Sequence, residues 1–175
     1  MNLFCCFGNV DKILIDSVTT SALIQFHYRS EALEALNSLD QVLFFNQELR
    51  ISMCDHQRLM FRLEELKRHP NILSLQGDHN YYRFQNSLKI RYNSPSSILH
   101  FTSLSERCDP VILFELIRQI NEPSKIIKLV QRGAKGSLMY LVEFDMPDQA
   151  IEVLAVMHNK VIDSRSIKVS FSIRR

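Results

Sequence analysis

The sequence predicts an α+β protein built from two copies of one domain, of which the first copy is incomplete. Two observations carry this prediction. The chain repeats itself at a spacing of 118 residues, and its C-terminal half alternates between strand-like and helix-like apolar patterns. The composition is that of a folded protein, because 46% of the 175 residues are hydrophobic and 23% are charged.

The internal repeat aligns two stretches without a gap. Leu23–Phe26 matches Leu141–Phe144, and Leu49–Met53 matches Ile167–Phe171 at the same spacing. Between these blocks, Ala32–Glu34 matches a second apolar and acidic triplet that begins at Ala150. Two copies of one domain are the simplest explanation of a gap-free match of this length.

The complete copy occupies residues 96–175, and it opens with a strand followed by a helix. Ser97–Leu104 alternates in period two, which places Leu99 and Phe101 on one face and His100 and Thr102 on the other. An N-cap and a first-turn proline at Asp109-Pro110 then open a helix that ends at Pro123.

Four further elements follow in the same copy. They are a strand over Lys125–Gln131, a strand over Ser137–Phe144, a helix that opens at Pro147, and a strand over Ser166–Ile173. The order β-α-β-β-α-β is that of the ferredoxin-like fold, a four-stranded antiparallel sheet with two helices on one face. The other face of the sheet is therefore expected to be either polar or a binding platform.

The first copy starts too late in the chain to be complete. Leu3-Phe4 corresponds to Leu113-Phe114 in the first helix of the second copy, so no residues remain for a preceding strand. We therefore expect a truncated domain over 1–57 that lacks its first strand, either in a fragment of a longer protein or in a degenerate copy, and we expect it to be the less stable copy. Residues 58–95 are predicted to be a linker that is partly helical, since apolar residues recur at helical spacing over Leu59–Leu66.

Several classes of function are not expected. No apolar run approaches the roughly 18 residues that a membrane span needs, and no signal peptide is recognisable, which favours an intracellular location. The four cysteines form no CxxC pair, so we expect reduced thiols and no metal. No catalytic motif is present, so we expect neither an enzyme nor a cofactor.

The charge is uneven, with 7 basic and 3 acidic residues over 58–95 but 3 basic and 7 acidic residues over 1–57.

Several stretches resemble a known family in order along the chain. They are Leu3–Val10, Ala22–Phe26, Arg50–Ser52 with His56-Gln57, Arg83-Phe84, Ser97–Phe101, Leu154–Asn159 and Val169–Ser172. Together they are similar to the last two RNA-recognition motifs (RRMs) of the polypyrimidine tract-binding protein and hnRNP L family. A generic RRM stacks bases on aromatic residues of its third strand, where this chain has Met139 and Leu141. The family likewise has aliphatic residues there, so the resemblance still implies RNA binding.

The resemblance implies a set of RNA-binding residues on the helix-free face of each copy. In the second copy a first-strand histidine stacks on a base, aliphatic residues contact bases, lysines neutralise phosphates, and serines of the fourth strand bond to uracil or cytosine edges. These residues are His100, Thr102, Lys128, Met139, Leu141, Lys168, Ser170 and Ser172. The corresponding candidates in the first copy are Leu23, Gln25, Arg50 and Ser52.

The function that these observations favour is binding of single-stranded, pyrimidine-rich RNA in pre-mRNA splicing or another step of RNA processing. The resemblance further implies a nuclear protein, with shuttling to the cytoplasm left open. An alternative from a different class is a degenerate module for protein–protein interaction, which binds splicing-regulatory proteins on its helical face and binds little RNA. Each isolated candidate also has an ordinary structural explanation, such as a solvated histidine or a surface lysine.

Overall fold

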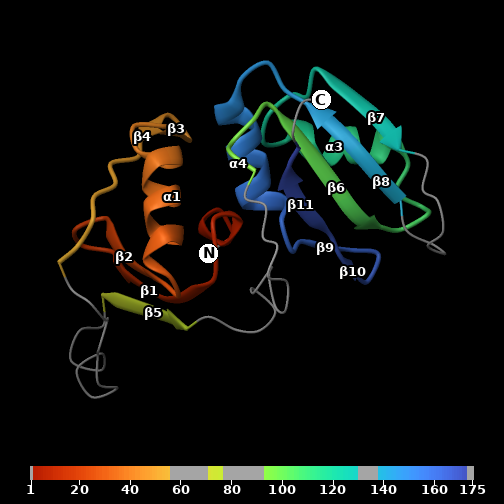
Figure 1. Ribbon diagram of the computed structural model, residues 1–175. Coiled ribbons are helices and arrows are strands. Elements are labelled where there is room, and N and C mark those ends of the chain that lie inside the picture. Colours follow the sequence, from red (N-terminus) through yellow and green to blue (C-terminus); the bar gives the residue numbers. More distant parts are fainter. Residues whose placement is uncertain (1, 56–70, 77–92, 130–137, 173–175) are drawn as a thin grey trace. The chain divides into compact units, whose positions relative to one another are not determined.

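The computed structural model describes residues 2–55, 71–76, 93–129 and 138–172 (Figure 1). The chain divides into two compact units. The first unit comprises residues 3–41 and 50–92, and the second comprises Asn2, residues 42–49 and residues 93–175.

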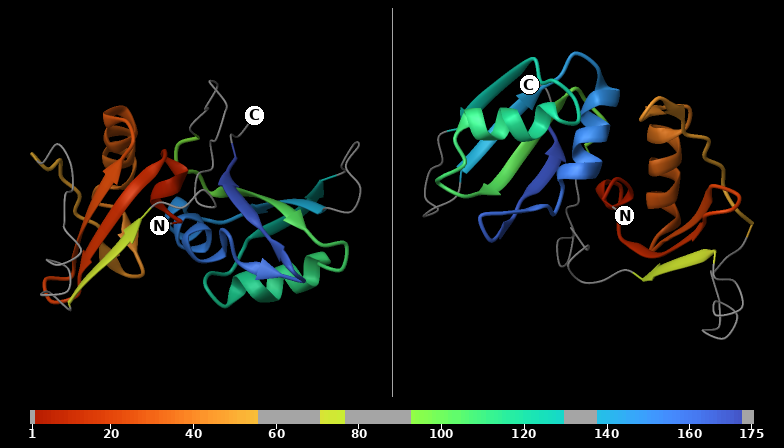
Figure 2. Two further views of the ribbon diagram at one scale, coloured as in Figure 1. Left: turned by 90° about the horizontal axis from the view of Figure 1, so that it is seen from below. Right: turned by 180° about the vertical axis from the view of Figure 1, so that it is seen from behind.

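The second unit has the predicted ferredoxin-like order of elements. These are β6 (Ile98–Leu104), α3 (Pro110–Arg118), β7 (Lys125–Leu129), β8 (Leu138–Glu143), α4 (Pro147–Met157), β9 (Val161–Ile162), β10 (Arg165–Ser166) and β11 (Lys168–Phe171). Strands β11, β6, β8 and β7 lie side by side in that order, all antiparallel, and a two-stranded hairpin of β9 and β10 precedes β11. Both helices cover the same face of the sheet (Figure 2). The predicted fold class is therefore confirmed for this unit.

Local sequence accounts for both helices of this unit. The Asp109 carboxylate caps α3 by accepting a hydrogen bond from the Ile112 amide at 2.8 Å, and Pro110 occupies the first helical turn. Helix α4 likewise starts at a proline, Pro147, and its apolar stripe includes Ala150, Ile151, Val153, Leu154 and Met157, all buried.

The two helices and one face of the sheet enclose the core. Leu99 and Phe101 of β6 are fully buried, as are Tyr140 of β8 and Val169 of β11. The Tyr140 hydroxyl donates a hydrogen bond to the Cys108 carbonyl oxygen at 3.0 Å, which satisfies its polar atom inside the core. The predicted alternation of inward and outward residues is thus confirmed along β11 and over Leu99–Thr102 of β6. A bulge after Phe101, with Ser103 at a φ of 64°, turns Leu104 inward, so the predicted alternation is wrong at that end of β6.

The first unit contains a 3₁₀ turn, a helix and a smaller sheet. Its elements are η1 (Phe4–Cys6), β1 (Val10–Asp16), β2 (Ser21–Phe26), α1 (Arg29–Leu39) and β5 (Ile72–Gln76). Strands β2, β1 and β5 form an antiparallel sheet in that order. Cys5, Val10 and Ile13 form a buried core cluster in this unit, against which Phe4, Ile15, Ile24, Phe26 and Leu75 pack.

This smaller sheet differs from that of the second unit at both of its edges. Among the described residues no strand occupies the place of β6, and residues 50–54, which the repeat aligns with β11, form no strand. At the other edge, β5 comes from the segment that we predicted to be a linker, and the sequence analysis does not anticipate it. The helix predicted over Leu59–Leu66 lies outside the described residues.

A second hairpin, β3 (Leu43–Phe44) with β4 (Gln47–Glu48), follows α1. Its turn residues Phe45 and Asn46 both have positive φ, 48° and 62°. The hairpin of β9 and β10 turns in the same way at Asp163 and Ser164, with φ of 48° and 61°. Two successive residues at positive φ are typical of the tight turn that matches strand twist.

Candidate functional site

A row of four side chains crosses the helix-free face of the second unit. Antiparallel register places Ser170 of β11 beside His100 of β6, His100 beside Leu141 of β8, and Leu141 beside Ile127 of β7. These residues alternate with Phe101, Tyr140 and Val169, which are buried under the helices, so the row faces away from the core. We call Ser170, His100, Leu141 and Ile127 the central row.

His100 lies on a central strand of the sheet and has unused hydrogen-bonding capacity. Its Nε2 atom is shielded from solvent and has no hydrogen-bond partner among the described residues. Burial lowers the pKa of the imidazole from its ordinary value of 6.5, because desolvation disfavours the charged form. A neutral imidazole can stack on a flat group through its face, while its in-plane nitrogens can exchange hydrogen bonds with other groups.

Three further predicted residues flank the central row on the same face. Thr102 is paired with Lys168 across β6 and β11, and its hydroxyl donates to the Lys168 carbonyl oxygen at 3.3 Å. The Lys168 ammonium donates to the side-chain oxygen of Asn159. Met139 lies two residues before Leu141 on β8, so it shares the same face.

Ser172 extends this face beyond the end of β11. Its amide donates to the Ile98 carbonyl oxygen at 2.9 Å, which continues the pairing with β6, and its own carbonyl oxygen accepts a hydrogen bond from the Ser96 hydroxyl at 2.9 Å. Asn93 holds the same edge by donating from its side-chain amide to the Phe171 carbonyl oxygen at 2.7 Å. The hydroxyl of Ser172 therefore stands on a backbone that is fixed on both sides.

Lys128 is not brought together with the other predicted residues. Its register partner is Tyr140, whose side chain is fully buried on the helix-covered side. Lys128 therefore belongs to the helix-covered side, at the edge strand. Lys125 and Ile127 occupy the helix-free side instead, and the sequence analysis missed both. Period-two alternation from Lys125 separates these residues into two faces, but it does not say which face is buried.

The first unit presents its predicted residues in a less ordered setting. Leu23 and Gln25 alternate with the core-packed Ile24 on β2, so they share the face opposite the core cluster. Arg50 and Ser52 are exposed and lie outside any strand. The structure thus gives these four residues no common row of the kind found in the second unit.

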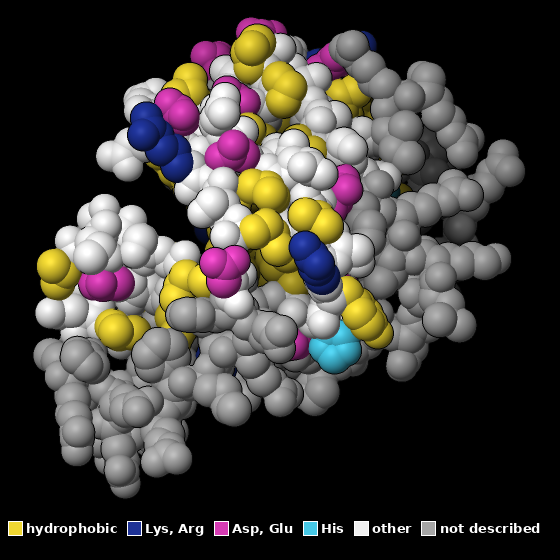
Figure 3. Space-filling model, turned by 60° about the vertical axis from the view of Figure 1, so that its left-hand side comes forward, with side chains coloured by type: hydrophobic (Ala, Val, Ile, Leu, Met, Phe, Trp, Pro, Cys, Tyr) yellow, Lys and Arg dark blue, Asp and Glu magenta, His cyan; other side chains and the backbone are white. Residues whose placement is uncertain are grey.

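Charge is dispersed over the described surface. On the side of the molecule shown in Figure 3, Lys and Arg side chains stand apart and are mixed with Asp and Glu.

No group of His, Cys, Asp and Glu among the described residues could hold a metal ion. No helix in the described part of the chain is long and apolar enough to cross a membrane. The cysteines are unpaired, with Cys54 exposed and the other three buried.

Comparisons with known proteins address both the second unit and the chain as a whole. Residues 89–174 match the family model of the RRM domain. The chain is 24% identical to polypyrimidine tract-binding protein homolog 3 of Arabidopsis thaliana, over 98% of this chain and 38% of that protein. It is 22% identical to heterogeneous nuclear ribonucleoprotein L of Homo sapiens, over 90% of this chain and 28% of that protein. The chain therefore spans well under half the length of the curated relatives it matches.

Solved structures show a likeness to the same domain. The RRM of Rna15 with bound RNA (GU) covers 46% of this chain and 86% of its own, with 13% identity and a TM-score of 0.40. The RRM3 domain of Hrb1 covers 47% of this chain and 83% of its own, with 14% identity and a TM-score of 0.43.

Proposed function

The chain carries an RRM domain of the polypyrimidine tract-binding protein and hnRNP L type, and on that premise we propose that it binds single-stranded, pyrimidine-rich RNA without catalysing a reaction. The observation that carries the proposal is the central row. It places a neutral imidazole on the central strand β6, beside Leu141 of β8, with Ile127 of β7 beyond Leu141. RRMs bind bases on this face of the sheet.

Each member of the row has a distinct part in the proposed contact. The His100 ring stacks on one base. Leu141 and Ile127 extend the apolar surface beneath the next base in place of the usual aromatic residues. Ser170 offers a hydroxyl beside His100 that can both donate and accept, as the edges of uracil and cytosine require.

The remaining residues are assigned to the rim of the site. Lys168 and Thr102 flank the central row toward one end of β11 and β6, and Ser172 flanks it toward the other end. Lys168 neutralises a phosphate, and the hydroxyls bond to sugar or base atoms. In the first unit we assign only Leu23 and Gln25 to a second, weaker contact.

Polypyrimidine preference and a nuclear role in RNA processing belong to the same proposal. They rest on the names of the relatives, one a polypyrimidine tract-binding protein homolog and the other a heterogeneous nuclear ribonucleoprotein.

The direct test is titration of fluorescently labelled oligo-U, oligo-C and oligo-A with the full chain at two salt concentrations. We expect tighter binding of the pyrimidines and a shallow dependence on salt, since base contacts and not phosphate charge carry the preference. His100→Ala should weaken oligo-U binding about tenfold, because stacking contributes about 1–3 kcal/mol per base. Unchanged oligo-U affinity in a folded His100→Ala variant would overturn the assignment.

Two lysines provide a matched pair of variants. Lys168→Ala removes a charge from the helix-free side, whereas Lys128→Ala removes one from the helix-covered side. We expect Lys168→Ala to weaken binding of all sequences alike and to reduce the salt slope by about 1. Lys128→Ala should leave oligo-U affinity unchanged, and equal effects of the two variants would show that only general charge attracts the RNA.

A further inference from the structure

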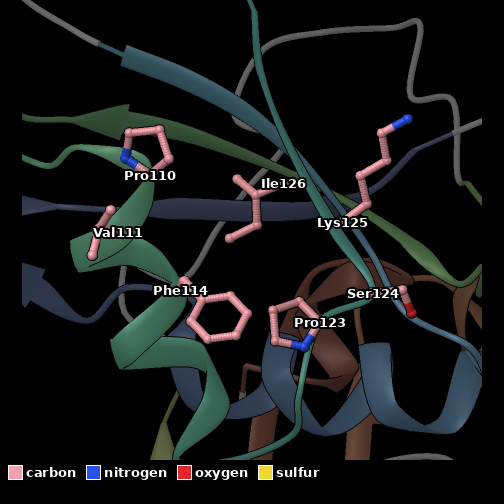
Figure 4. A pocket seen from close by; sticks show the side chains of 7 residues that line it. All are labelled: Pro110, Val111, Phe114, Pro123, Ser124, Lys125 and Ile126. Carbon is pink, nitrogen blue, oxygen red and sulfur yellow. The ribbon is translucent and has the colours of Figure 1, made fainter.

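A cavity of about 310 Å³ opens beside α3, on the helix-covered side of the second unit. Helix α3 contributes Pro110, Val111 and Phe114, and β7 with its preceding loop contributes Pro123, Ser124, Lys125 and Ile126 (Figure 4). Phe114 and Pro123 lie around Ile126 in this view. Most of the lining is apolar, and Val111 at its rim is 68% exposed. The central row takes no part in this cavity.

The cavity lies next to an open strand edge. β7 is the outermost strand of its sheet, and no described strand pairs with it on the side away from β8. An edge strand of this kind offers unpaired backbone N–H and C=O groups to an added strand.

The first unit shows what can occupy this place. The repeat makes β1 the counterpart of β7. Ile24 of β2 and Val142 of β8 are 118 residues apart and so are equivalent. Ile13 pairs with Ile24, and Ile126 pairs with Val142, so Ile13 and Ile126 are equivalent as well. In the first unit the corresponding edge is not open, because β5 pairs with β1 in antiparallel register. The repeat thus contains one copy with an added strand at this edge and one copy without it.

A leucine of β5 fills the position that corresponds to the cavity. Leu75 is the register partner of Ile13, the counterpart of Ile126. Leu75 and Phe4 both pack against the core cluster of the first unit, and Phe4 is the counterpart of Phe114. The cavity between Phe114 and Ile126 therefore lies where the first unit places an apolar side chain from its added strand.

We propose that the β7 edge and this cavity together bind an extended peptide segment of a partner protein, which adds an antiparallel strand and inserts a leucine or isoleucine into the cavity. Register also sets the charge of that partner. Lys128 stands where the first unit has Ile15, whose partner on β5 is Leu73. A partner segment should therefore carry an acidic residue two positions before its inserted leucine, opposite Lys128.

The test uses short synthetic peptides and the full chain. The parent peptide has the sequence of residues 71–76, blocked at both ends, and a second peptide carries Leu73→Glu. We expect the acidic peptide to bind at least threefold more tightly than the parent at low salt, and this advantage to shrink at high salt. A third peptide that combines Leu73→Glu with Leu75→Ser should lose binding at least tenfold. Equal binding of the acidic peptide and this third peptide would overturn the proposal.

Two variants of the chain locate the site. Val111→Asp places a charge at the rim of the cavity, in the first turn of α3 where an acidic residue suits the helix. Val161→Asp is the matched control, because Val161 is 66% exposed but lies on the hairpin of β9 and β10. We expect Val111→Asp to weaken binding of the acidic peptide at least tenfold and Val161→Asp to leave it unchanged. Equal loss in both variants would contradict the assigned site.

Two more readouts separate this proposal from its competitors. Amide exchange on β7 should slow when the acidic peptide binds, because the outward N–H groups become paired, and unchanged exchange would exclude strand addition. Dimerisation of the chain that Val111→Asp abolishes would assign the site to a second copy and overturn the proposal. Oligo-U binding should be the same in Val111→Asp and in the unmodified chain, so this proposal and RNA binding can fail independently.

Discussion

The two copies build the same local structures with different side chains. Helices α1 and α4 start and end at positions 118 residues apart, and so do the two hairpins with their paired positive-φ turns. At the start of α1, Glu31 accepts hydrogen bonds from the amides of Tyr28 and Asn9, at 3.0 and 3.2 Å. Its counterpart Gln149 accepts a hydrogen bond from the Met146 amide at 3.0 Å. The capping geometry is thus kept while the charge of the capping residue changes.

The residue after each helix likewise keeps its hydrogen bond while the type of side chain changes. The Asp40 carboxylate accepts a hydrogen bond from the Ile51 amide at 2.8 Å, and in the second copy the His158 Nδ1 atom accepts one from the Val169 amide at 3.1 Å. Val169 belongs to a strand paired with β6, whereas Ile51 belongs to none. The contact alone therefore does not make a strand, because a strand also needs a neighbour to complete its ladder.

In this molecule both copies keep the same local structure, but they differ in their long-range strand pairing. Caps, turns and helix lengths depend on residues a few positions apart, and both copies keep them. Sheet membership depends on which partner strand is present, and there the copies differ at both edges.

The largest effect should come from one leucine that the repeat places in both copies. Leu154 is fully buried in α4, while its counterpart Leu36 in α1 is only half-buried. We expect Leu154→Ala to lower the free energy of unfolding by about 2–5 kcal/mol, and Leu36→Ala by clearly less, because less packing is lost. Urea unfolding followed by circular dichroism measures both. Equal losses would show that the first unit is packed as tightly as the second.

A close contact in the first unit should give the next largest effect. A Cβ atom added at Gly8 would lie 2.3–2.5 Å from atoms of the Glu31 side chain, which cannot withdraw without breaking its cap. We expect Gly8→Ala to lower the free energy of unfolding by about 1–3 kcal/mol through this overlap. Combining it with Glu31→Ser should cost less than the sum of the two single changes. Additive costs would mean that the two residues do not compete for space.

Much of the second unit could be predicted because its pattern is local. The cap at Asp109 and the alternation over Leu99–Thr102 each report on a few neighbouring residues, and both predictions are confirmed, whereas the bulge that turns Leu104 inward was not predicted. β5 was missed because Ile72–Gln76 is a short apolar run whose pairing with β1 spans some sixty residues, and no local pattern reports such a pairing.

The candidate site was predictable in part for the same reason. His100 and Ser170 follow from alternation within single strands, and the register brings them together. Lys128 was assigned to the wrong side of β7 relative to them, since edge strands with exposed residues on both faces do not reveal their inward phase. Ile127 was missed by the same ambiguity. The proposed RNA contacts of all these residues stay predictions.

The hydrogen bonds that His158 and Asp40 accept after the two helices should differ in their effect on stability. Loss of the first should lower the stability of the whole second unit, and loss of the second should loosen only its own neighbourhood. His158 is buried against β11, so His158→Ala should lower the free energy of unfolding of the second unit by about 1–3 kcal/mol by leaving the Val169 amide unsatisfied. Asp40→Ala should instead raise the exchange rate of the Ile51 amide, with about 1 kcal/mol or less of global cost. Hydrogen exchange resolves both. A comparable global loss in Asp40→Ala would show that residues 50–54 contribute as much as β11 does.

The smallest effect should be a dependence on pH of the stability of the second unit. Burial lowers the pKa of His100 below 6.5, so between these two values the unfolded chain binds more protons at this residue than the folded chain does. This contribution to stability is therefore complete above pH 6.5 and is lost as the pH falls through the lowered pKa. Replacing the imidazole by His100→Gln should flatten this part of the stability profile of the second unit, while the exchange rates of β1 amides in the first unit keep their own pH dependence. A stability profile that is the same with and without the imidazole would mean that the ring is as well solvated folded as unfolded, which would also remove the neutral stacking surface from the central row.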